Sequence, residues 1–386
     1  MNQRRALSTC LSPLFLLSLT LFSSPVPLTL AADRTEWQLD TISFTNELAR
    51  MGGSSTVVVA IIDGGVDFTH KDLGEQLRWR NSDEIPGNGL DDDNNGYIDD
   101  VYGWNFVDQT NNTAPVRENR DDNNNGWFDE QYSHGTFIAG IIAGQGKRIR
   151  GLVPNIRILD VKAFNSDGTA GDLVAAWKYV ESFGNNISVI NFSASMSEDV
   201  YQQVIPTLDK LVHDHGVVVV AASGNADPTD DLYEIALPAN HTDVLSVGAV
   251  GRDLTLTNFS RRGSGLDLVA PGERLFSTVP DDLYEDAGSG TSYAAPFVTG
   301  AVAYLRSLPT STPLTTDDIR GFVTNTTTDL GPAGYDAEYG HGLLNMTTLV
   351  AAVPTKESHL AHWELLGPSF LLASGAFTIL KKRRRI

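Results

Sequence analysis

Five short, largely apolar runs divide the middle of the chain, and each has the length of a single strand. They lie at residues 56–62, 157–163, 187–193, 217–222 and 244–250. Runs of this kind are typical of strands that are buried on both faces of a parallel sheet. Segments with helical patterns alternate with them, at residues 170–183, 200–214, 292–307 and 316–324. The alternation predicts a three-layer α/β domain, with a mostly parallel central sheet and helices on both of its faces.

One acidic residue stands where such a sheet binds its ligands. Ligands lie beyond the carboxyl ends of the strands, and Asp63 directly follows the apolar run 56–62. Gly64 and Gly65 then let the chain turn away sharply. On this local pattern alone, a turn or cap role for Asp63 is the alternative.

Two further segments each present one polar side chain at the start of a predicted helix. In SHGTFIAGIIAG (133–144), His134 precedes an apolar, small-residue helical pattern. In GSGTSYAAPFVTG (288–300), Ser292 lies shortly before Pro296. Proline is tolerated near the first turn of a helix, so the helix should begin close to Ser292 and expose it at the positive end. The alternatives are a structural histidine and an N-cap serine.

The three side chains together can form a nucleophile, its base and the carboxylate that orients the base. A serine hydroxyl is a poor nucleophile and needs an adjacent base. A histidine can take its proton and later return it to the leaving amine, and a buried carboxylate fixes the imidazole tautomer and stabilises the charged ring. The order Asp63, His134, Ser292 therefore predicts a catalytic triad.

The motifs AIIDGGVD, HGTFIAG and GTSYAAP resemble those of the subtilisin-like serine proteases, the subtilases, over about residues 36–350. The resemblance implies an exported serine endopeptidase with polypeptide substrates. It also implies an oxyanion donor at Asn225, in VVVVAASGNAD, and the sequence supports this role independently because the amide lies just past a predicted buried strand. Transfer of the acyl group to an amine (a ligase or cyclase), or a catalytically silent, calcium-stabilised surface binding module, are the alternatives.

The same resemblance places substrate-binding residues on two segments that follow predicted strands. They are Ser193, Ala194, Ser195, Ala222 and Gly224. Ser195 stands where the family usually has glycine, so we expect its side chain to narrow the first specificity pocket or to alter peptide pairing there. Phe137 likewise replaces a common second histidine.

An acidic repeat lies between Asp63 and His134, in an insertion at residues 86–130. DDDNNGYIDD (91–100) and DDNNNGWFDE (121–130) are near-copies whose alternating oxygen ligands and glycine follow the logic of a calcium loop. The predicted ligands are Asp91, Asp93, Asn95, Asp99, Asp121, Asn123, Asn125 and Asp129. The twelfth position holds tyrosine rather than glutamate, so Asp100 and Glu130 are candidates to close the sites. We expect structural Ca²⁺, and a solvated acidic loop is the alternative.

The two ends of the chain have the features of targeting segments. Residues 1–31 contain two arginines, an apolar stretch and small residues, which predicts a signal peptide cleaved after Ala31; an N-terminal membrane anchor is the alternative. The only cysteine, Cys10, lies within it. Residues 363–380, after a linker at 354–362, predict a short hydrophobic anchor or sorting segment before the basic tail 381–386. A final helix packed on the domain is the alternative.

Composition and charge narrow the partners of the remaining domain, residues 32–353. The 386-residue chain is 41% hydrophobic and 20% charged, which is ordinary for a globular protein. Its net charge of −20 argues against a nucleic-acid partner, because phosphates would repel it, and suits bound cations. We expect a monomeric protein that is exported, with membrane contact only through the C-terminal segment.

Overall fold

The computed structural model describes residues 37–118, 131–226 and 234–355. The predicted signal peptide, the C-terminal segment and the second acidic copy lie outside the described residues. Within these ranges, no helix is both long enough and apolar enough to cross a membrane.

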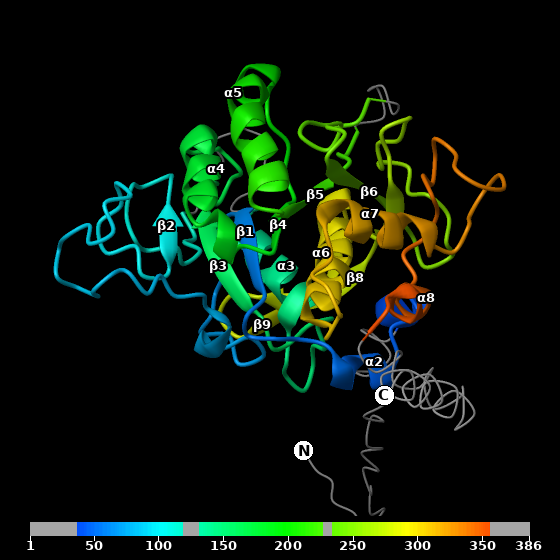
Figure 1. Cartoon of the computed structure of the whole chain (residues 1–386), viewed down its shortest axis with the longest axis horizontal. Helices are drawn as coiled ribbons and strands as arrows, with labels where there is room; N and C mark the ends of the chain where they lie inside the picture. The colour runs from blue at the N-terminus through cyan, green and yellow to red at the C-terminus, as the bar shows by residue number, and fades with distance from the viewer. Residues whose placement is uncertain (1–36, 119–130, 227–233, 356–386) are drawn as a thin grey trace, which may run out of the picture.

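A seven-stranded, fully parallel sheet forms the centre of the domain (Figure 1), in the order β2-β3-β1-β4-β5-β6-β7. Its strands are β1 (Val58–Asp63), β2 (Gly103–Asn105), β3 (Arg157–Lys162), β4 (Val189–Phe192), β5 (Val218–Ala222), β6 (Val244–Val250) and β7 (Leu268–Pro271). The five predicted strands are confirmed to within two residues at each end. The two edge strands, β2 and β7, were not predicted, and neither was the antiparallel hairpin β8 (Leu275–Val279) and β9 (Leu283–Gly288).

Helices cover both faces of this sheet. They are α2 (Asn46–Met51), α3 (His134–Ala143), α4 (Leu173–Ser182), α5 (Glu198–Asp209), α6 (Thr291–Ser307), α7 (Thr316–Asn325) and α8 (Met346–Ala352), with short 3₁₀ turns η1 (Glu75–Leu77) and η2 (Gly184–Asn186) and a π-helical turn η3 (Lys210–Asp214). Their positions confirm the predicted helices, except that the segment predicted at 200–214 is α5 followed by η3.

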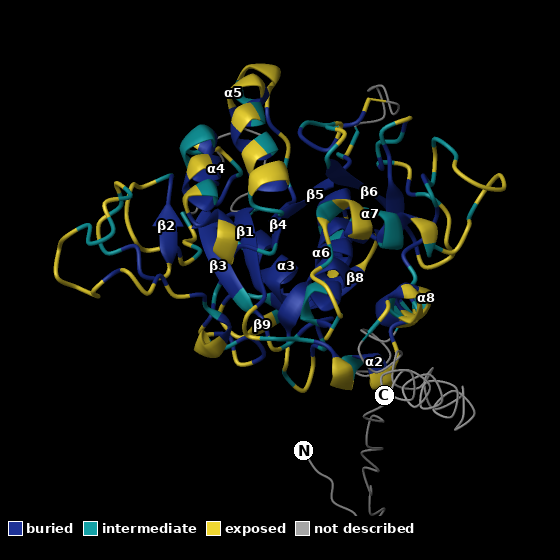
Figure 2. Cartoon of the chain, in the orientation of Figure 1, coloured by how far each residue is buried: buried dark blue, intermediate teal, exposed yellow. Residues whose placement is uncertain are grey.

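Two neighbouring residues of β4 show which helices lie on which face. Asn191 is hydrogen-bonded to Thr299 of α6, and the ring of Phe192 packs 5.6 Å from that of Trp177 in α4. Consecutive strand residues point to opposite faces, so α6 and α4 cover opposite faces of the sheet. The three-layer prediction is confirmed, and Figure 2 shows the strands and α3 buried between helices whose outer sides are exposed.

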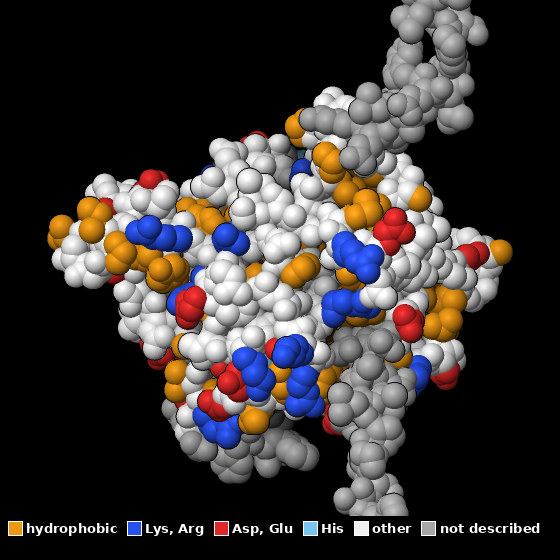
Figure 3. All heavy atoms as spheres, turned by 90° about the horizontal axis from the view of Figure 1, so that it is seen from below, with side chains coloured by type: hydrophobic (Ala, Val, Ile, Leu, Met, Phe, Trp, Pro, Cys, Tyr) orange, Lys and Arg blue, Asp and Glu red, His pale blue; other side chains and the backbone are white. Residues whose placement is uncertain are grey.

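Figure 3, a view from below, shows several groups of Lys and Arg side chains among Asp and Glu side chains on this face, although the whole chain carries a net charge of −20.

Candidate active site

Asp63 is the last residue of β1, at the carboxyl edge of the sheet. Its side chain is 2% exposed, and its Oδ1 accepts a hydrogen bond of 2.7 Å from the Gly64 N–H. Gly65 has φ of 100°, and a Cβ there would lie 2.2 Å from the Thr113 carbonyl oxygen. Only glycine can make this turn, so the local sequence fixes the direction of the Asp63 carboxylate.

His134 begins α3 and faces that carboxylate. Its Nδ1 lies 2.9 Å from Asp63 Oδ1 and 3.0 Å from Oδ2, and the histidine is buried. A carboxylate can only accept, so the proton of the neutral ring is on Nδ1 and the Nε2 lone pair is free to take a proton. The ring of Tyr293 lies 5.0 Å from the His134 ring and 4.4 Å from that of Phe137. Phe137, which replaces the family's usual histidine, therefore helps to pack the aromatic wall beside the base.

Ser292 lies in the first turn of α6, as predicted, but Pro296 is well inside the helix. Ser292 is only 9% exposed, so the expectation of an exposed serine is wrong. Pro296 has no N–H, which leaves the Ser292 carbonyl without its helical donor. The Ser193 hydroxyl donates to that carbonyl at 2.7 Å instead. A serine predicted to bind substrate thus takes the place of a missing backbone hydrogen bond.

A buried chain of hydrogen bonds holds the Ser193 hydroxyl in turn. Asn191 Nδ2 donates to Ser193 Oγ at 2.9 Å, and the Thr299 hydroxyl donates to Asn191 Oδ1 at 2.8 Å. Asn191 and Thr299 are fully buried. The chain links β4 to α6 and fixes the backbone that carries Ser292.

Asn225, just beyond β5, is oriented by Thr291. Its Oδ1 accepts from the Thr291 N–H at 2.9 Å and from the Thr291 hydroxyl at 3.0 Å. Because both partners donate, the oxygen of the amide must face them and Nδ2 must face away. The Thr291 hydroxyl also accepts from the Gly224 N–H at 3.2 Å.

One pocket of about 180 Å³ brings the predicted catalytic residues together. Its lining includes Asp63, His134, Asn225 and Ser292. A Cβ at Gly290 would lie 3.0 Å from Ser292 Oγ and 3.3 Å from Asn225 Nδ2, so the space between nucleophile and amide donor depends on that glycine. Among the described residues no hydrogen bond joins Ser292 Oγ to His134, and such contacts often tighten only when substrate binds.

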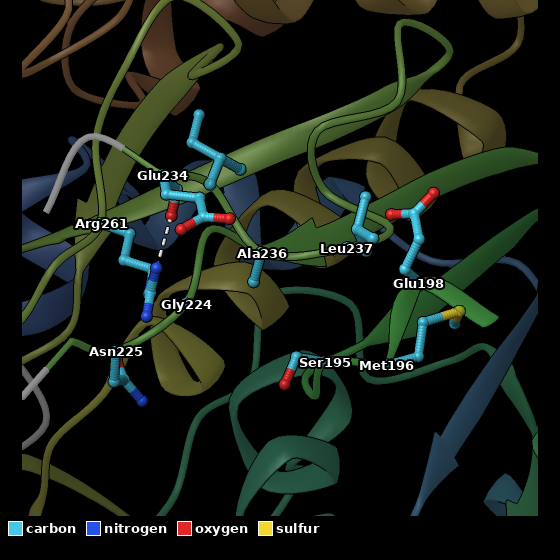
Figure 4. Close-up of a pocket in the computed structure, with 10 residues that line it drawn as sticks. Ser195, Met196, Glu198, Gly224, Asn225, Glu234, Ala236, Leu237 and Arg261 are labelled. Atoms are coloured by element: carbon cyan, nitrogen blue, oxygen red, sulfur yellow. Dashed lines mark hydrogen bonds between the residues drawn. The ribbon is translucent and has the colours of Figure 1, made fainter. Parts of the chain in front are cut away.

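A second pocket, of about 380 Å³, borders Asn225 (Figure 4). It is lined by Ser195, Met196, Glu198, Gly224, Asn225, Glu234, Ile235, Ala236, Leu237 and Arg261. Ser195 and Gly224 were predicted here, and Ser195 lines the pocket without closing it. Ser193 and Ala194 line the catalytic pocket instead, while Ala222 is buried and lines neither.

The charged lining of the second pocket was not predicted. Arg261 Nη1 donates to the Glu234 carbonyl oxygen at 2.8 Å, and the Glu234 and Glu198 carboxylates also border the space (Figure 4). No local sequence pattern marks these residues, because they come from segments that are far apart in the sequence, Glu198 from the start of α5 and the other two from loops.

The first acidic copy contributes Asp93, a predicted ligand, and Asp100, a candidate to close the site, to a carboxylate cluster that also contains Glu84. One oxygen each of Glu84, Asp93 and Asp100 lie within 4.8 Å of one another. Asp91 instead accepts from the Gly96 N–H at 2.8 Å, and Asp99 accepts from the Gly89 N–H at 2.9 Å. Asp91 and Asp99 thus shape the loop, whereas Asp93 and Asp100 lie in the cluster. Asp121, Asn123, Asn125 and Asp129 lie outside the described residues.

Two of the three carboxylates in this cluster are buried, which favours a bound cation. Glu84 is 2% exposed, Asp100 is fully buried, and burial raises the pKa of both carboxyls. The Nδ2 atoms of Asn81 and Asn95 each donate to Asp93 and Asp100, but Glu84 Oε2 is buried without a hydrogen-bond partner. Buried carboxylates are normally paired or bound to a metal, and an all-oxygen set fits Ca²⁺. Glu84 was missed because it lies before the repeat.

Known proteins resemble this chain over most of its length. The model of the Subtilase family matches residues 54–342. The chain is 34% identical over 260 residues to the Thermophilic serine proteinase of Bacillus sp. (strain AK1), covering 66% of this chain and 53% of that protein. It is 32% identical over 218 residues to Subtilisin DY of Bacillus licheniformis, covering 55% and 76%. It is 31% identical over 296 residues to Subtilisin E of Bacillus subtilis (strain 168), covering 76% and 65%. The aligned part thus spans between about half and three quarters of these relatives.

Proposed function

Because the chain belongs to the subtilase family, we propose that it is a serine endopeptidase that hydrolyses peptide bonds through an acyl-enzyme intermediate. The convergence of Asp63, His134, Ser292 and Asn225 on one pocket carries this proposal. The adjoining 380 Å³ pocket supports it, because it offers a place for the side chain before the scissile bond.

In the proposed mechanism, Ser292 Oγ attacks the peptide carbonyl carbon and its proton passes to His134 Nε2. Asp63 holds the ring by Nδ1 and stabilises the imidazolium. The carbonyl oxygen becomes negative and accepts from Asn225 Nδ2 and the Ser292 N–H. The C–N bond then breaks as His134 protonates the leaving amine. In the second half, water attacks the acyl carbon and gives a proton to His134, and the bond to Ser292 Oγ breaks as His134 returns that proton to the serine oxygen.

A Ser292→Ala variant tests the proposal. We expect loss of peptide hydrolysis and of labelling by a fluorophosphonate probe, with an unchanged circular dichroism spectrum. Mass spectrometry of the products separates hydrolysis, which adds water, from acyl transfer to an amine, which does not. A folded parent protein that neither cleaves peptides nor reacts with the probe would favour a catalytically silent module.

We also propose that Ca²⁺ binds to Glu84, Asp93 and Asp100. The ion would supply the positive charge that the buried carboxylates of Glu84 and Asp100 lack and would tie the insertion to the domain. Its role is structural, and no catalytic step depends on it. Equal melting temperatures with Ca²⁺ and with a chelator would contradict this assignment.

Export, with residues 1–31 as the signal peptide, remains a proposal that rests on the sequence pattern. We propose in addition that residues 363–380 tether the exported enzyme or serve as a sorting segment. The mass of the protein recovered from the producing cells tests both, because cleavage after Ala31 leaves Ala32 as the first residue.

A further inference from the structure

A second group of metal-ligating side chains lies at the junction of α5 and the loop that enters β6. Asp209 ends α5, His213 lies in η3, and Asp243 directly precedes β6. One ligand atom of each lies within 4.8 Å of the other two. None of these residues lines the catalytic pocket or the pocket beside it.

The spacing of these atoms suits a small tetrahedral ion. His213 Nε2 lies 3.1 Å from Asp243 Oδ2. Two ligands of a tetrahedral Zn²⁺ lie about 3.3 Å apart, given Zn–N and Zn–O distances of about 2.0–2.2 Å. Asp209 and His213 are four residues apart on continuous helical backbone, so they project from the same side. The three ligand atoms lie within 4.8 Å of one another, so side-chain movement alone would complete three protein ligands.

A neighbouring histidine, His241, is hydrogen-bonded to the backbone of one member of this group. His241 Nδ1 accepts a 3.1 Å hydrogen bond from the Asp243 N–H, so the proton of the neutral ring is on Nε2, which lies 3.8 Å from Asp209 Oδ1. At 3.8 Å the His241 Nε2–H faces the Asp209 carboxylate without a hydrogen bond, and Nδ1 is occupied by the Asp243 N–H, so His241 is not one of the ligands. Groups around a metal site orient its ligands, and here His241 fixes the backbone of Asp243. The ring is held edge-on to Tyr201, 6.2 Å away, and is only 15% exposed.

We propose that Asp209, His213 and Asp243 bind one Zn²⁺ ion, with water completing the coordination. The imidazole selects a borderline ion of the Zn²⁺ type over Ca²⁺ and Mg²⁺, which prefer oxygen ligands. Two carboxylates balance the charge of the ion. The His213 side chain is 61% exposed, which gives the ion a path from solvent.

The backbone between the ligands is unusual in the same place. The His215 N–H donates to the Lys210 carbonyl at 3.1 Å, the i to i+5 bond of the π-turn η3. Such turns are rare and often occur at functional sites. An ion here would cross-link the end of α5 to the loop before β6, and would stabilise the native state because the unfolded chain lacks the site.

Calorimetric titration of Zn²⁺ into the full chain tests the proposal. The Ser292→Ala variant prevents self-digestion, and excess Ca²⁺ saturates the acidic insertion. We expect one Zn²⁺ per chain, with affinity lowered at least about tenfold in His213→Gln and a parallel loss of the Zn²⁺-induced rise in melting temperature. His215→Gln is the matched control, since His215 lies two residues away and contacts Glu181 and Asn185 instead. It should bind as the parent does.

A second variant keeps the test valid if His213→Gln does not fold. Asp243→Asn keeps the side-chain size and should also weaken Zn²⁺ binding at least about tenfold, with an unchanged circular dichroism spectrum. Zn²⁺ affinity that is equal in the parent, His213→Gln and Asp243→Asn, or a parent that binds no Zn²⁺, would overturn the assignment.

Discussion

The hydrogen bond from Ser193 to the Ser292 carbonyl can be tested by removing it and then restoring a substitute. Ser193→Ala leaves that carbonyl without a donor, since Pro296 has no N–H to offer. It also takes away the acceptor of the Asn191 amide. Pro296→Ala returns a backbone N–H four residues after Ser292, which is the normal helical donor.

The expected magnitude follows from burial. Ser193 and Ser292 are buried and Asn191 is fully buried, so water replaces the lost bonds only poorly. A buried polar group left unpaired costs about 1–3 kcal/mol. We therefore expect Ser193→Ala to lower the free energy of unfolding by about 2 kcal/mol with Pro296 present. With Pro296→Ala the carbonyl regains a donor, and the loss should fall to about 1 kcal/mol.

Urea denaturation of four proteins measures this coupling. All carry Ser292→Ala to prevent self-digestion, which leaves the backbone carbonyl in place. The cycle compares the parent, Ser193→Ala, Pro296→Ala and the double variant. An equal loss from Ser193→Ala in both backgrounds would refute the explanation, because the serine would then act independently of the missing proline N–H. In the active enzyme, Ser193→Ala should lower kcat more than it changes KM, since the serine touches the nucleophile's backbone.

Three further predictions concern the oxyanion donor, a buried carboxyl and the calcium cluster. Asn225→Ala should lower kcat about 10²–10³-fold with little change in KM, and steady-state kinetics on a peptide substrate would contradict this if only KM rose. Burial raises the pKa of Asp160 to about 7 from the usual 3.8. Between these two values the native state keeps a proton that the unfolded state has lost. The free energy of unfolding should therefore fall by up to about 4 kcal/mol as the pH rises from 3.8 to about 7. Urea denaturation of Asp160→Asn should lack that fall, whereas Asp40→Asn, an exposed control, should retain it. Saturating Ca²⁺ should raise the melting temperature by roughly 5 °C, and Asp100→Asn should remove most of this rise in a calorimetric scan.

The parts of the fold that could be predicted are those with a local cause. An apolar run must be buried on both faces, so β1, β3, β4, β5 and β6 were found from composition alone. The edge strand β2 could not be found, because three residues carry no periodic pattern. β7 also ends at Pro271, a residue that usually argues against a strand. The edges of the sheet are defined by their neighbours rather than by their own sequence.

The convergence of the proposed catalytic side chains was predictable for a related reason. Asp63 ends β1, Asn225 lies just past β5, and His134 and Ser292 lie in the first turns of helices, and parallel topology brings all these ends to one edge of the sheet. Glu84, Glu198 and Arg261 were not predictable, because their places beside the cluster or the pocket are fixed only when the whole domain is folded. Glu84 and Arg261 lie in loops, and Glu198 begins α5. The predicted calcium ligands of the first acidic copy stay a prediction, and two of them also shape the loop. Asp91 and Asp99 fit the motif, but their oxygens accept backbone N–H groups that the turns would otherwise leave unpaired.

Ser193 was predicted to bind substrate, and its hydrogen bond to Ser292 can also be traced to a local feature of the sequence. Pro296 is the sixth residue of α6, so the carbonyl four residues earlier, that of Ser292, must find another donor. The helix lies against the sheet, and Ser193 directly follows β4, at the edge where the nucleophile must be. A hydroxyl at that position is the simplest donor available. The role of Ser193 thus follows from an unmet backbone hydrogen bond, and it makes the position of Ser292 depend on a proline that lines neither pocket.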